Sequence, residues 1–479
     1  MQEKRFPFSH SREMSHNVKG FSLITICIIM ILNIISCTSV APTLKSPPQN
    51  QPAPDLETEP YESISASMSA GRPEEAVEKF ENAYSENPES IETQLLYSSL
   101  LITTGQVEKA ELTIRKILSS APDNTEALYN LALIKAVKED QKARQLLLEQ
   151  VISLDPTHAS AYAALGELFL EKQKLDEAEE QFIKSIQNNP RNLVARTGYG
   201  HVLLSRKKYP EAEEQLNQAI EIDPKYPFAY VDRSKARSGN GNINGALEDL
   251  STAIELDPAH FWNYIDRGNL YLHIGNMEGA LEDFNQAIEL KPDYFLAYVY
   301  RAGILNDLND YDAAYDTYRT LISLKEDYYP AYEPLALIAY NNEKYSEAAM
   351  YFKRHYQRFR KDHGHALMAG ISLLFAGEEQ KAVDYLKSNM ESMQDDTCMY
   401  DIARLFTEKG YESYLLTKLV NEKNITLKIR ALFYLATYYK LHEEIGLANT
   451  YFLEVADANI YGLFETELAH HELSGKIEE

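Results

Sequence analysis

Prolines recur at a fixed interval along this chain, and this spacing constrains the fold more than any other feature. Seven of them stand 34 residues apart: Pro88, Pro122, Pro156, Pro190, Pro224, Pro258 and Pro292. Alanines repeat with the same period: Ala76, Ala110, Ala178, Ala212, Ala246, Ala280, Ala314, Ala348 and Ala382. A fixed period of about 20–50 residues is typical of proteins built from one repeated supersecondary unit. Such a chain grows in one dimension, so its 479 residues need not divide into separate cores.

Each repeat is taken to start three residues after its proline. The units then begin at residues 57, 91, 125, 159, 193, 227, 261, 295, 329, 363 and 397, with a last unit at 429. The unit from 261 carries Tyr264, Arg267, Gly268, Tyr271, Ala280, Phe284, Ala287 and Pro292. This pattern resembles the tetratricopeptide repeat (TPR), which usually has Trp in place of Tyr264 and Leu in place of Arg267. The resemblance implies an all-α fold, a right-handed α-solenoid of about twelve TPR helical hairpins with the first helices on the concave side.

The repeated residues have physical reasons to be small or rigid. A small residue at the eighth place of a unit, such as Gly166 or Gly268, lets the second helix approach the first closely. The alanine at the twentieth place faces this contact, and a Phe or Leu four residues later fills the space beside it. The proline ends the second helix, because it has no amide hydrogen and disfavours helical backbone in the residue before it.

The repeat pattern defines an array over residues 57–460, and its regularity declines toward the C-terminus. The weakest unit spans 397–428, since Leu416 stands where alanine is expected. Residues 461–479 are expected to form a capping helix and a tail, because the last repeat of such an array needs a polar outer face.

The N-terminal segment has the pattern of an export signal. A net positive stretch precedes an apolar run over residues 21–36, which is short for a transmembrane helix and typical of a signal peptide. The run ends at Ile34-Ile35-Ser36-Cys37, which resembles a bacterial lipobox, although Ile34 replaces the usual Leu and Ile35 is larger than the preferred residue. The resemblance implies a signal peptide over 1–36 and acylation of Cys37. An uncleaved membrane anchor is the alternative.

Residues 37–56 combine prolines with polar residues and hold too little apolar surface to fold. We expect this segment to be a tether that separates the array from the membrane. The start of the chain is Met1 or Met14, the second giving a more typical charged region. With either start, the sequence predicts a membrane-anchored lipoprotein of the cell envelope that faces the periplasm or the exterior.

Composition and motifs argue against several classes of function. A net charge of −25 disfavours nucleic-acid binding, which needs basic residues to neutralise phosphates. The close histidine pairs, His363/His365 and His470/His471, lack the i, i+4 spacing of a helical zinc pair. No phosphate-binding loop or nucleophile elbow occurs, and Cys398 reads as a buried, inert thiol. The sequence therefore predicts no metal, no cofactor and no catalytic site.

The family resemblance also implies a ligand groove, lined by the second, fifth, ninth and twelfth places of the first helices. In the three most regular units these places include Phe228, Val231, Lys235, Trp262, Ile265, Asn269, Leu296 and Val299. Repeats that bind the acidic tails of chaperones have Lys and Asn at the fifth and ninth places, whereas the fifth places here are aliphatic. We expect Phe228, Trp262, Ile265 and Val299 to form one concave apolar strip, with Trp262 as its main anchor.

Two sets of charged residues stand out. A basic patch near the C-terminal third is either the solvated face of a second helix or a docking site for an acidic partner or lipid head groups. It consists of Lys353, Arg354, Arg358, Arg360 and Lys361, with His355, His363 and His365 among them. Arginines also recur at the seventh place, and we expect each to pair with its own second helix: Arg233 with Glu248 or Asp249, Arg267 with Glu282 or Asp283, and Arg301 with Asp316.

These features favour a non-catalytic scaffold that binds proteins or peptides in its concave groove, for the assembly of an envelope complex. The alternative is an accessory subunit of a transport or cell-wall enzyme system.

Overall fold

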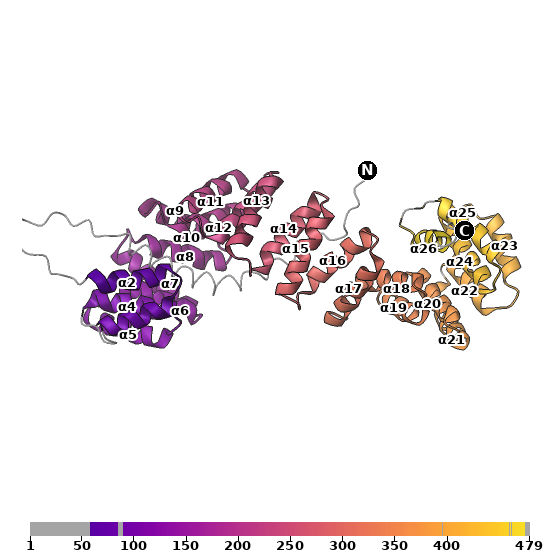
Figure 1. The fold of residues 1–479 in the computed structure, drawn as a ribbon, viewed down its shortest axis with the longest axis horizontal. Helices are drawn as coiled ribbons and strands as arrows, with labels where there is room; N and C mark the ends of the chain where they lie inside the picture. The colour runs from indigo at the N-terminus through magenta and orange to yellow at the C-terminus, as the bar shows by residue number, and fades with distance from the viewer. Residues whose placement is uncertain (1–57, 85–89, 395, 459, 461, 475–479) are drawn as a thin grey trace, which may run out of the picture. The chain divides into compact units, whose positions relative to one another are not determined.

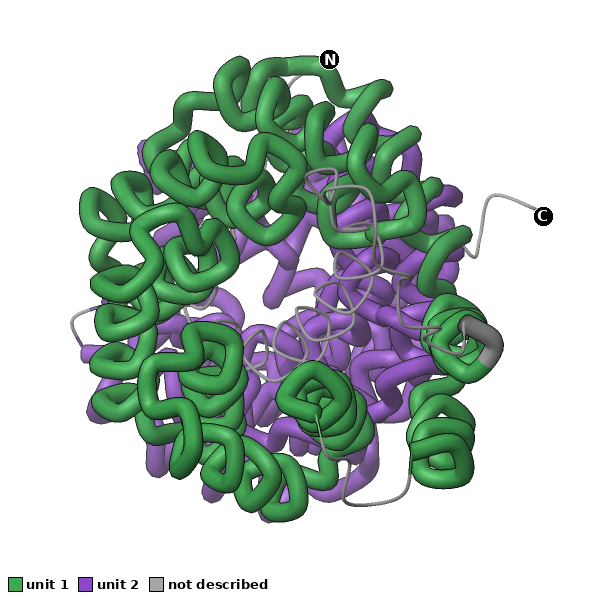
Figure 2. The backbone as a smooth tube through the Cα atoms, turned by 90° about the vertical axis from the view of Figure 1, so that its left-hand side faces the viewer, with its two compact units in different colours: residues 1–258 green, residues 259–479 purple. Residues whose placement is uncertain are grey.

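The computed structural model describes residues 58–84, 90–394, 396–458, 460 and 462–474. Within these ranges the protein is all-α and contains no β-strand (Figure 1). The chain divides into two compact units, residues 1–258 and 259–479, which have different colours in Figure 2. The predicted signal peptide, Cys37 and the tether lie outside the described residues. No helix in the described part of the chain is long and apolar enough to cross a membrane.

Unit 1 is a series of helices that pack in consecutive pairs. Its described helices are α2 (Thr58–Ser69), α3 (Pro73–Tyr84), α4 (Ile91–Thr103), α5 (Val107–Ser120), α6 (Thr125–Val137), α7 (Gln141–Leu154), α8 (Ala159–Glu171), α9 (Leu175–Asn188), α10 (Leu193–Ser205), α11 (Tyr209–Ile222), α12 (Pro227–Gly239) and α13 (Ile243–Leu256). One cluster of buried apolar residues extends from Ile64 to Leu168 and joins several hairpins into a continuous core.

Unit 2 continues the paired arrangement and ends in an additional helix. Its described elements are α14 (Phe261–His273), α15 (Met277–Leu290), α16 (Phe295–Asp307), α17 (Tyr311–Leu324), η2 (Tyr329–Ala331), α18 (Tyr332–Asn341), α19 (Tyr345–Arg358), α20 (His363–Phe375), α21 (Glu379–Met390), η3 (Glu391–Met393), α22 (Thr397–Thr407), α23 (Glu412–Val420), α24 (Ile425–Leu441), α25 (Ile445–Ala458) and α26 (Phe464–Ser474). The predicted fold, an α-solenoid of helical hairpins, is confirmed.

Contacts between the two helices of a hairpin agree with the size requirements of the repeat. The alanines at the twentieth places have no exposed surface: Ala76, Ala110, Ala178, Ala212, Ala246, Ala280, Ala314, Ala348 and Ala382. A Cβ atom added at Gly166 would lie 2.7 Å from the ring of Phe182, and one added at Gly370 would lie 2.5 Å from Leu386. The eighth-place glycine is therefore needed because the large residue of the second helix occupies the volume of its missing side chain.

The turn inside each hairpin has a conserved geometry along the array. The fifteenth place has a positive φ, whether or not it is glycine, in every unit except the one at 397, where Tyr411 has a φ of −74°. These residues are Gly71, Gly105, Glu139, Gln173, Lys207, Gly241, Gly275, Asn309, Glu343, Gly377 and Glu443. Second helices end where the prolines predict, as at α7, in which Asp155 is the C-cap residue and directly precedes Pro156. The side chain of Asp155 then accepts a hydrogen bond from the backbone N–H of Thr157 and orders the turn.

Unit 2 is less regular between residues 329 and 441. The first helix of the unit at 329 begins as the 3-10 turn η2, which contains Pro330. Helices α22 and α23 have 11 and 9 residues, and Leu416 lies in α23 at the place of the missing alanine. Helix α24 begins at Ile425, four residues before the expected start, because Asn424 caps its N-terminus by accepting from the N–H of Leu427.

Candidate functional site

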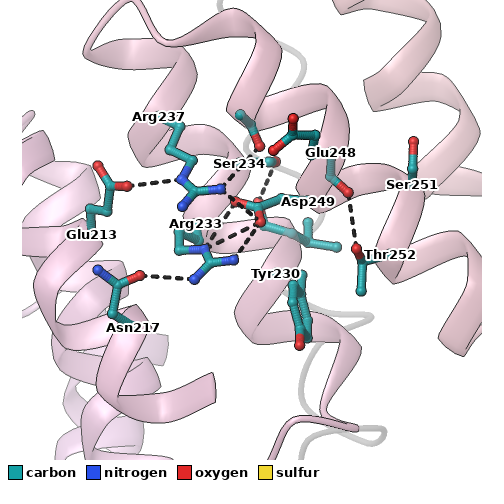
Figure 3. Close-up of polar contacts among 12 residues, drawn as sticks. Glu213, Asn217, Tyr230, Arg233, Ser234, Arg237, Glu248, Asp249, Ser251 and Thr252 are labelled. Carbon is teal, nitrogen blue, oxygen red and sulfur yellow. Dashed lines mark hydrogen bonds and ion pairs between the residues drawn. The ribbon is translucent and has the colours of Figure 1, made fainter. Parts of the chain in front are cut away.

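A network of ion pairs links three helices of unit 1 (Figure 3). Asp249 on α13 is buried and forms ion pairs with two arginines of α12. Its Oδ1 lies 2.6 Å from Nη2 of Arg233 and 3.1 Å from Nη1 of Arg237. The same arginines reach back to α11 of the preceding hairpin, where Arg233 donates to Asn217 and Arg237 pairs with Glu213. These contacts tie one hairpin to the next, so the network stabilises the array.

The expected arginine ladder is confirmed at two of its three positions. Arg233 pairs with Asp249, and Arg267 pairs with Asp283 at 2.7 Å. The prediction for Arg301 and Asp316 is wrong. Nε of Arg301 is buried and makes no hydrogen bond within the described residues, and no ion pair joins it to Asp316. Both formed pairs join residues sixteen positions apart, and this position after Arg301 holds Thr317 instead of an aspartate.

The predicted groove residues of unit 1 lie on α12 and differ in exposure. Phe228 is half-buried, with its ring 5.5 Å from that of Tyr226. Lys235 is exposed and pairs with Asp232 at 2.9 Å. Val231 is buried, with 9% of its surface exposed. Phe228 and Lys235 thus remain accessible, whereas Val231 contributes little surface for a ligand.

The predicted groove residues of unit 2 lie on α14 and α16. Trp262 is half-buried in an aromatic cluster, with ring centroids 4.8 Å from Phe261 and 5.1 Å from Tyr294. Ile265 has only 4% of its surface exposed, so it contributes little surface for a ligand. The remaining predicted residues are partly exposed: Asn269, Leu296 and Val299. Trp262 therefore packs within its own unit and also presents a surface.

Sequence reasoning took the groove from the three central units only and missed a hollow earlier in unit 1. Its lining includes Tyr129 of α6, Ser160, Ala163 and Glu167 of α8, and Val194 of α10. These are second, fifth and ninth places of three consecutive first helices, the places expected to line a groove. The cavity volume is about 20 Å³, enough for about one water molecule. The repeat register, applied to the earlier units, would have named these lining residues.

Glu167 gives this hollow an unusual charge state. Burial raises the pKa of Glu167 to about 8, although Arg144 opposes the shift. Arg144 comes from the second helix α7, lies 3.7 Å from Glu167 and donates to Glu171 at 3.1 Å. Glu167 is therefore largely protonated at pH 7 and can donate a hydrogen bond as well as accept one.

Two members of the predicted basic patch are engaged in contacts with neighbouring side chains. Arg354 pairs with Glu326 and lies against the rings of Tyr329 and Tyr332, and the ammonium group of Lys353 lies 4.7 Å from the ring of Tyr385. The other members are exposed around the end of α19: Arg358, Arg360 and Lys361.

A cleft of about 550 Å³ lies beside this patch in unit 2. Its lining combines Lys353 and Arg354 with apolar side chains, among them Met350, which is 53% exposed. The volume falls within the range of small-molecule or side-chain binding clefts.

Two histidines that the sequence placed in the basic patch are buried instead. His355 and His365 have 4% and 5% of their surfaces exposed. Burial lowers the pKa of His355, with a further contribution from His365, so this imidazole is neutral at pH 7. Cys398 is half-buried, and burial raises the pKa of its thiol to about 12, so the thiol stays protonated at neutral pH.

Four stretches of the chain match family models described as tetratricopeptide repeat: residues 67–134, 147–180, 164–227 and 264–294. These stretches are similar to the tetratricopeptide repeat, and together they cover less than half of the chain. The comparison with curated proteins finds no match.

Among solved structures, YrrB, described as a TPR protein with an unusual peptide-binding site, is 23% identical. The match covers 38% of this chain and 95% of YrrB, with a TM-score of 0.34. PilF of Pseudomonas aeruginosa is 19% identical over 42% of this chain and 92% of its own, with a TM-score of 0.39. A TPR protein from Parabacteroides merdae is 18% identical over 52% of this chain and 98% of its own, with a TM-score of 0.37.

Proposed function

We propose that this TPR chain is a non-catalytic scaffold that binds a protein or an extended peptide along its first helices. The observation that carries the proposal is that Trp262 and Leu296, at the second places of the consecutive first helices α14 and α16, both remain partly exposed. A ligand along these helices contacts one side chain from each repeat, which is how an extended peptide is recognised.

The contrast between packing places and groove places supports this function. Most twentieth places are alanines with no exposed surface, for example Ala246 and Ala280. By contrast, the second places of the central units are Phe228, Trp262 and Leu296, all partly exposed. Side chains that packing does not fix supply the chemical variety that a specific partner requires.

Export and acylation complete the proposal. The signal-like segment and the residues before Cys37 support an exported protein held to a membrane by acyl chains at that cysteine. The tether over residues 37–56 then leaves the array accessible to extracytoplasmic partners, and we propose that the scaffold serves the assembly of an envelope complex.

The acylation step is tested with a fatty-acid probe in cells that produce the full chain. Wild type is expected to incorporate the probe, whereas Cys37→Ser is expected to lose the label and accumulate as an unprocessed precursor. Cys27→Ser, within the apolar run, is the matched control and should keep the label. Labelling that persists in Cys37→Ser would mean that the apolar run is a plain membrane anchor.

Partner binding is tested by a pull-down from detergent-solubilised membranes with wild type and Trp262→Ala. Loss of an aromatic anchor worth about 2 kcal/mol weakens a complex roughly thirtyfold. Because Trp262 packs against Tyr294, circular dichroism must first show an unchanged helix content. Tyr311→Ala, which removes an exposed ring from the second helix α17, is the control and should leave binding unchanged.

The basic patch provides the competing result. An apolar contact depends weakly on salt, whereas an acidic ligand on the patch loses affinity as salt screens the charges. If Arg354→Glu and Arg358→Glu abolish binding while Trp262→Ala leaves it intact, the partner binds at the patch and the groove proposal is wrong.

A further inference from the structure

Two histidines and a glutamate come together in unit 2 from three consecutive helices. Glu333 lies in the first turn of α18, His355 near the end of α19 and His365 in the first turn of α20. One ring nitrogen of each histidine and one carboxylate oxygen of Glu333 all lie within 4.8 Å of one another. The two imidazole rings are stacked, with centroids 4.1 Å apart.

Three ring nitrogens of this cluster lack the hydrogen bonds that buried polar groups normally make. Nδ1 of His355 and both nitrogens of His365 make no hydrogen bond within the described residues. A neutral imidazole has one N–H donor and one lone pair, and in His365 Nδ1 has no partner while Nε2 approaches only Oε1 of Glu333, at 3.4 Å. Buried polar groups in folded proteins are nearly always satisfied, and an exception calls for a bound ion or water molecule as its explanation.

The distances suit a small metal ion. Nε2 of His365 lies 3.4 Å from Oε1 of Glu333. Two ligands of a tetrahedral zinc ion, each about 2.1 Å from the metal, are separated by about 3.4 Å. These two atoms therefore already have the separation of a ligand pair, and the ring of His355 has to move toward them to complete the site.

A second carboxylate orients His355. Nε2 of His355 lies within hydrogen-bonding distance of Asp362, at 3.2 Å from Oδ2. Histidines that bind a metal nearly always donate their other N–H to a carboxylate, carbonyl or water, which fixes the lone pair on the opposite nitrogen. Donation to Asp362 leaves the lone pair of His355 on Nδ1, the nitrogen without a partner.

We propose that Glu333, His355 and His365 bind one divalent transition-metal ion, with Zn²⁺ as the best fit. Imidazole ligands favour such ions over Mg²⁺ and Ca²⁺, which prefer all-oxygen sites. Three protein ligands leave a fourth position to water, and the side chain of Glu333 is 40% exposed and opens the site to solvent. The rings of Phe359 and Phe464 lie 4.7 and 4.8 Å from His355 and His365 and cover the two imidazoles.

The bound ion would join α18, α19 and α20, in the less regular part of unit 2. This role is independent of partner binding by the first helices, so either proposal can fail without the other.

The test uses the full chain in detergent, purified through a tag without histidines and stripped of metal with a chelator. Titration with Co²⁺ is followed by the visible absorption of the four-coordinate ion, and Zn²⁺ affinity is then measured by competition. One ion per chain is expected. Glu333→Gln keeps the size of a half-exposed side chain and should lower Zn²⁺ affinity on the order of 100-fold. Asp362→Asn should lower it roughly 10–100-fold.

The control variant carries His470→Ala and His471→Ala, two exposed histidines of α26, and should bind like wild type. His365→Ala should abolish the Co²⁺ absorption, and if this variant fails to fold, Glu333→Gln decides the question. The proposal is overturned if the wild-type chain binds no stoichiometric ion, or if Glu333→Gln binds Zn²⁺ as tightly as wild type.

Discussion

The hairpins between α6 and α13 and the region between α18 and α26 are built from the same kind of helix pair but are held together differently. In the first region the contacts repeat locally, as between Gly166 and Phe182 within one hairpin. In the second, α26 folds back onto α18, α24 and α25. The buried carboxylate of Glu465 on α26 pairs with Arg430 at 2.8 Å and accepts a hydrogen bond from the hydroxyl of Tyr434 at 3.1 Å.

The difference shows that the same helix pair can be stabilised in two ways, with different consequences for unfolding. An array with only neighbour contacts has a stability close to the sum of its repeats and their interfaces, so parts of it can open separately. A region closed by contacts between distant residues is expected to unfold as one cooperative unit, because its stabilising groups lose their partners together.

The largest expected effect lies in the closed region. Glu465→Ala leaves Arg430 without its buried partner and should lower the free energy of unfolding of unit 2 by about 3 kcal/mol, measured by urea unfolding. His470→Ala removes an exposed side chain of the same helix and should change stability by less than about 0.5 kcal/mol. A loss below about 1 kcal/mol in Glu465→Ala would show that α26 does not close this region.

The repeated hairpin contact is tested by a pair of substitutions at places of opposite character. Ala280→Leu adds volume at a fully buried contact and should destabilise the protein by about 1–3 kcal/mol. Gly303→Ala adds a methyl group where nothing lies within 4 Å, so it should stabilise α16 by about 0.5–1 kcal/mol through helix propensity. Equal melting temperatures for the two variants would show that the packing register is wrong.

The sequence predicted the parts of the fold that repeat. Alanine, glycine and proline at fixed places are enough to position a hairpin, and α14 begins at Phe261, where the unit was expected to start. The absence of an ion pair at Arg301 could also have been predicted from the sequence, because Thr317 occupies the place that holds an aspartate in the two pairs that form. The burial of Val231 and Ile265 was not readable, because exposure depends on how neighbouring helices cover each place.

The cluster of Glu333, His355 and His365 shows a second limit. Its members occupy non-equivalent places in successive helices, so no repeat pattern or local motif brings them together. Contacts of this kind depend on the packing of the less regular helices in unit 2, where η2 and the long α24 depart from the period.

The acidic hollow in the regular region is expected to make stability depend on pH. The folded-state pKa of Glu167 is raised to about 8, above its ordinary value, so its contribution to stability is present at low pH and is lost as pH rises toward 8. Between about pH 5 and 8 the free energy of unfolding of wild type should fall by about 3 kcal/mol more than that of Glu167→Gln. The measurement is urea unfolding of both proteins at pH 5 and at pH 8. An equal change in the free energy of unfolding for wild type and Glu167→Gln would contradict the prediction.

The smallest effects concern the turn that both regions share. Lys207 has a φ of 58°, a backbone conformation that is strained for a residue with a Cβ atom and unstrained for glycine. Lys207→Gly should therefore stabilise the protein by about 0.5–1 kcal/mol. Gly241 occupies the same place in the next hairpin with a φ of 84°, and Gly241→Ala should destabilise by about 1 kcal/mol. The measurement is the melting temperature of each variant. If Lys207→Gly and Gly241→Ala shift it in the same direction, the two turns do not have the same geometry.

The most direct test of the account asks which helices touch the partner. A photo-crosslinking amino acid is placed at Leu296 on the first helix α16 or at Leu324 on the second helix α17, both accessible positions of unit 2. A third site, Met350, reports on the cleft beside the basic patch. After irradiation in cells, crosslinked partner should appear from Leu296 and not from Leu324 or Met350. Crosslinks from Leu324 or Met350 with none from Leu296 would contradict the claim that the first helices hold the ligand.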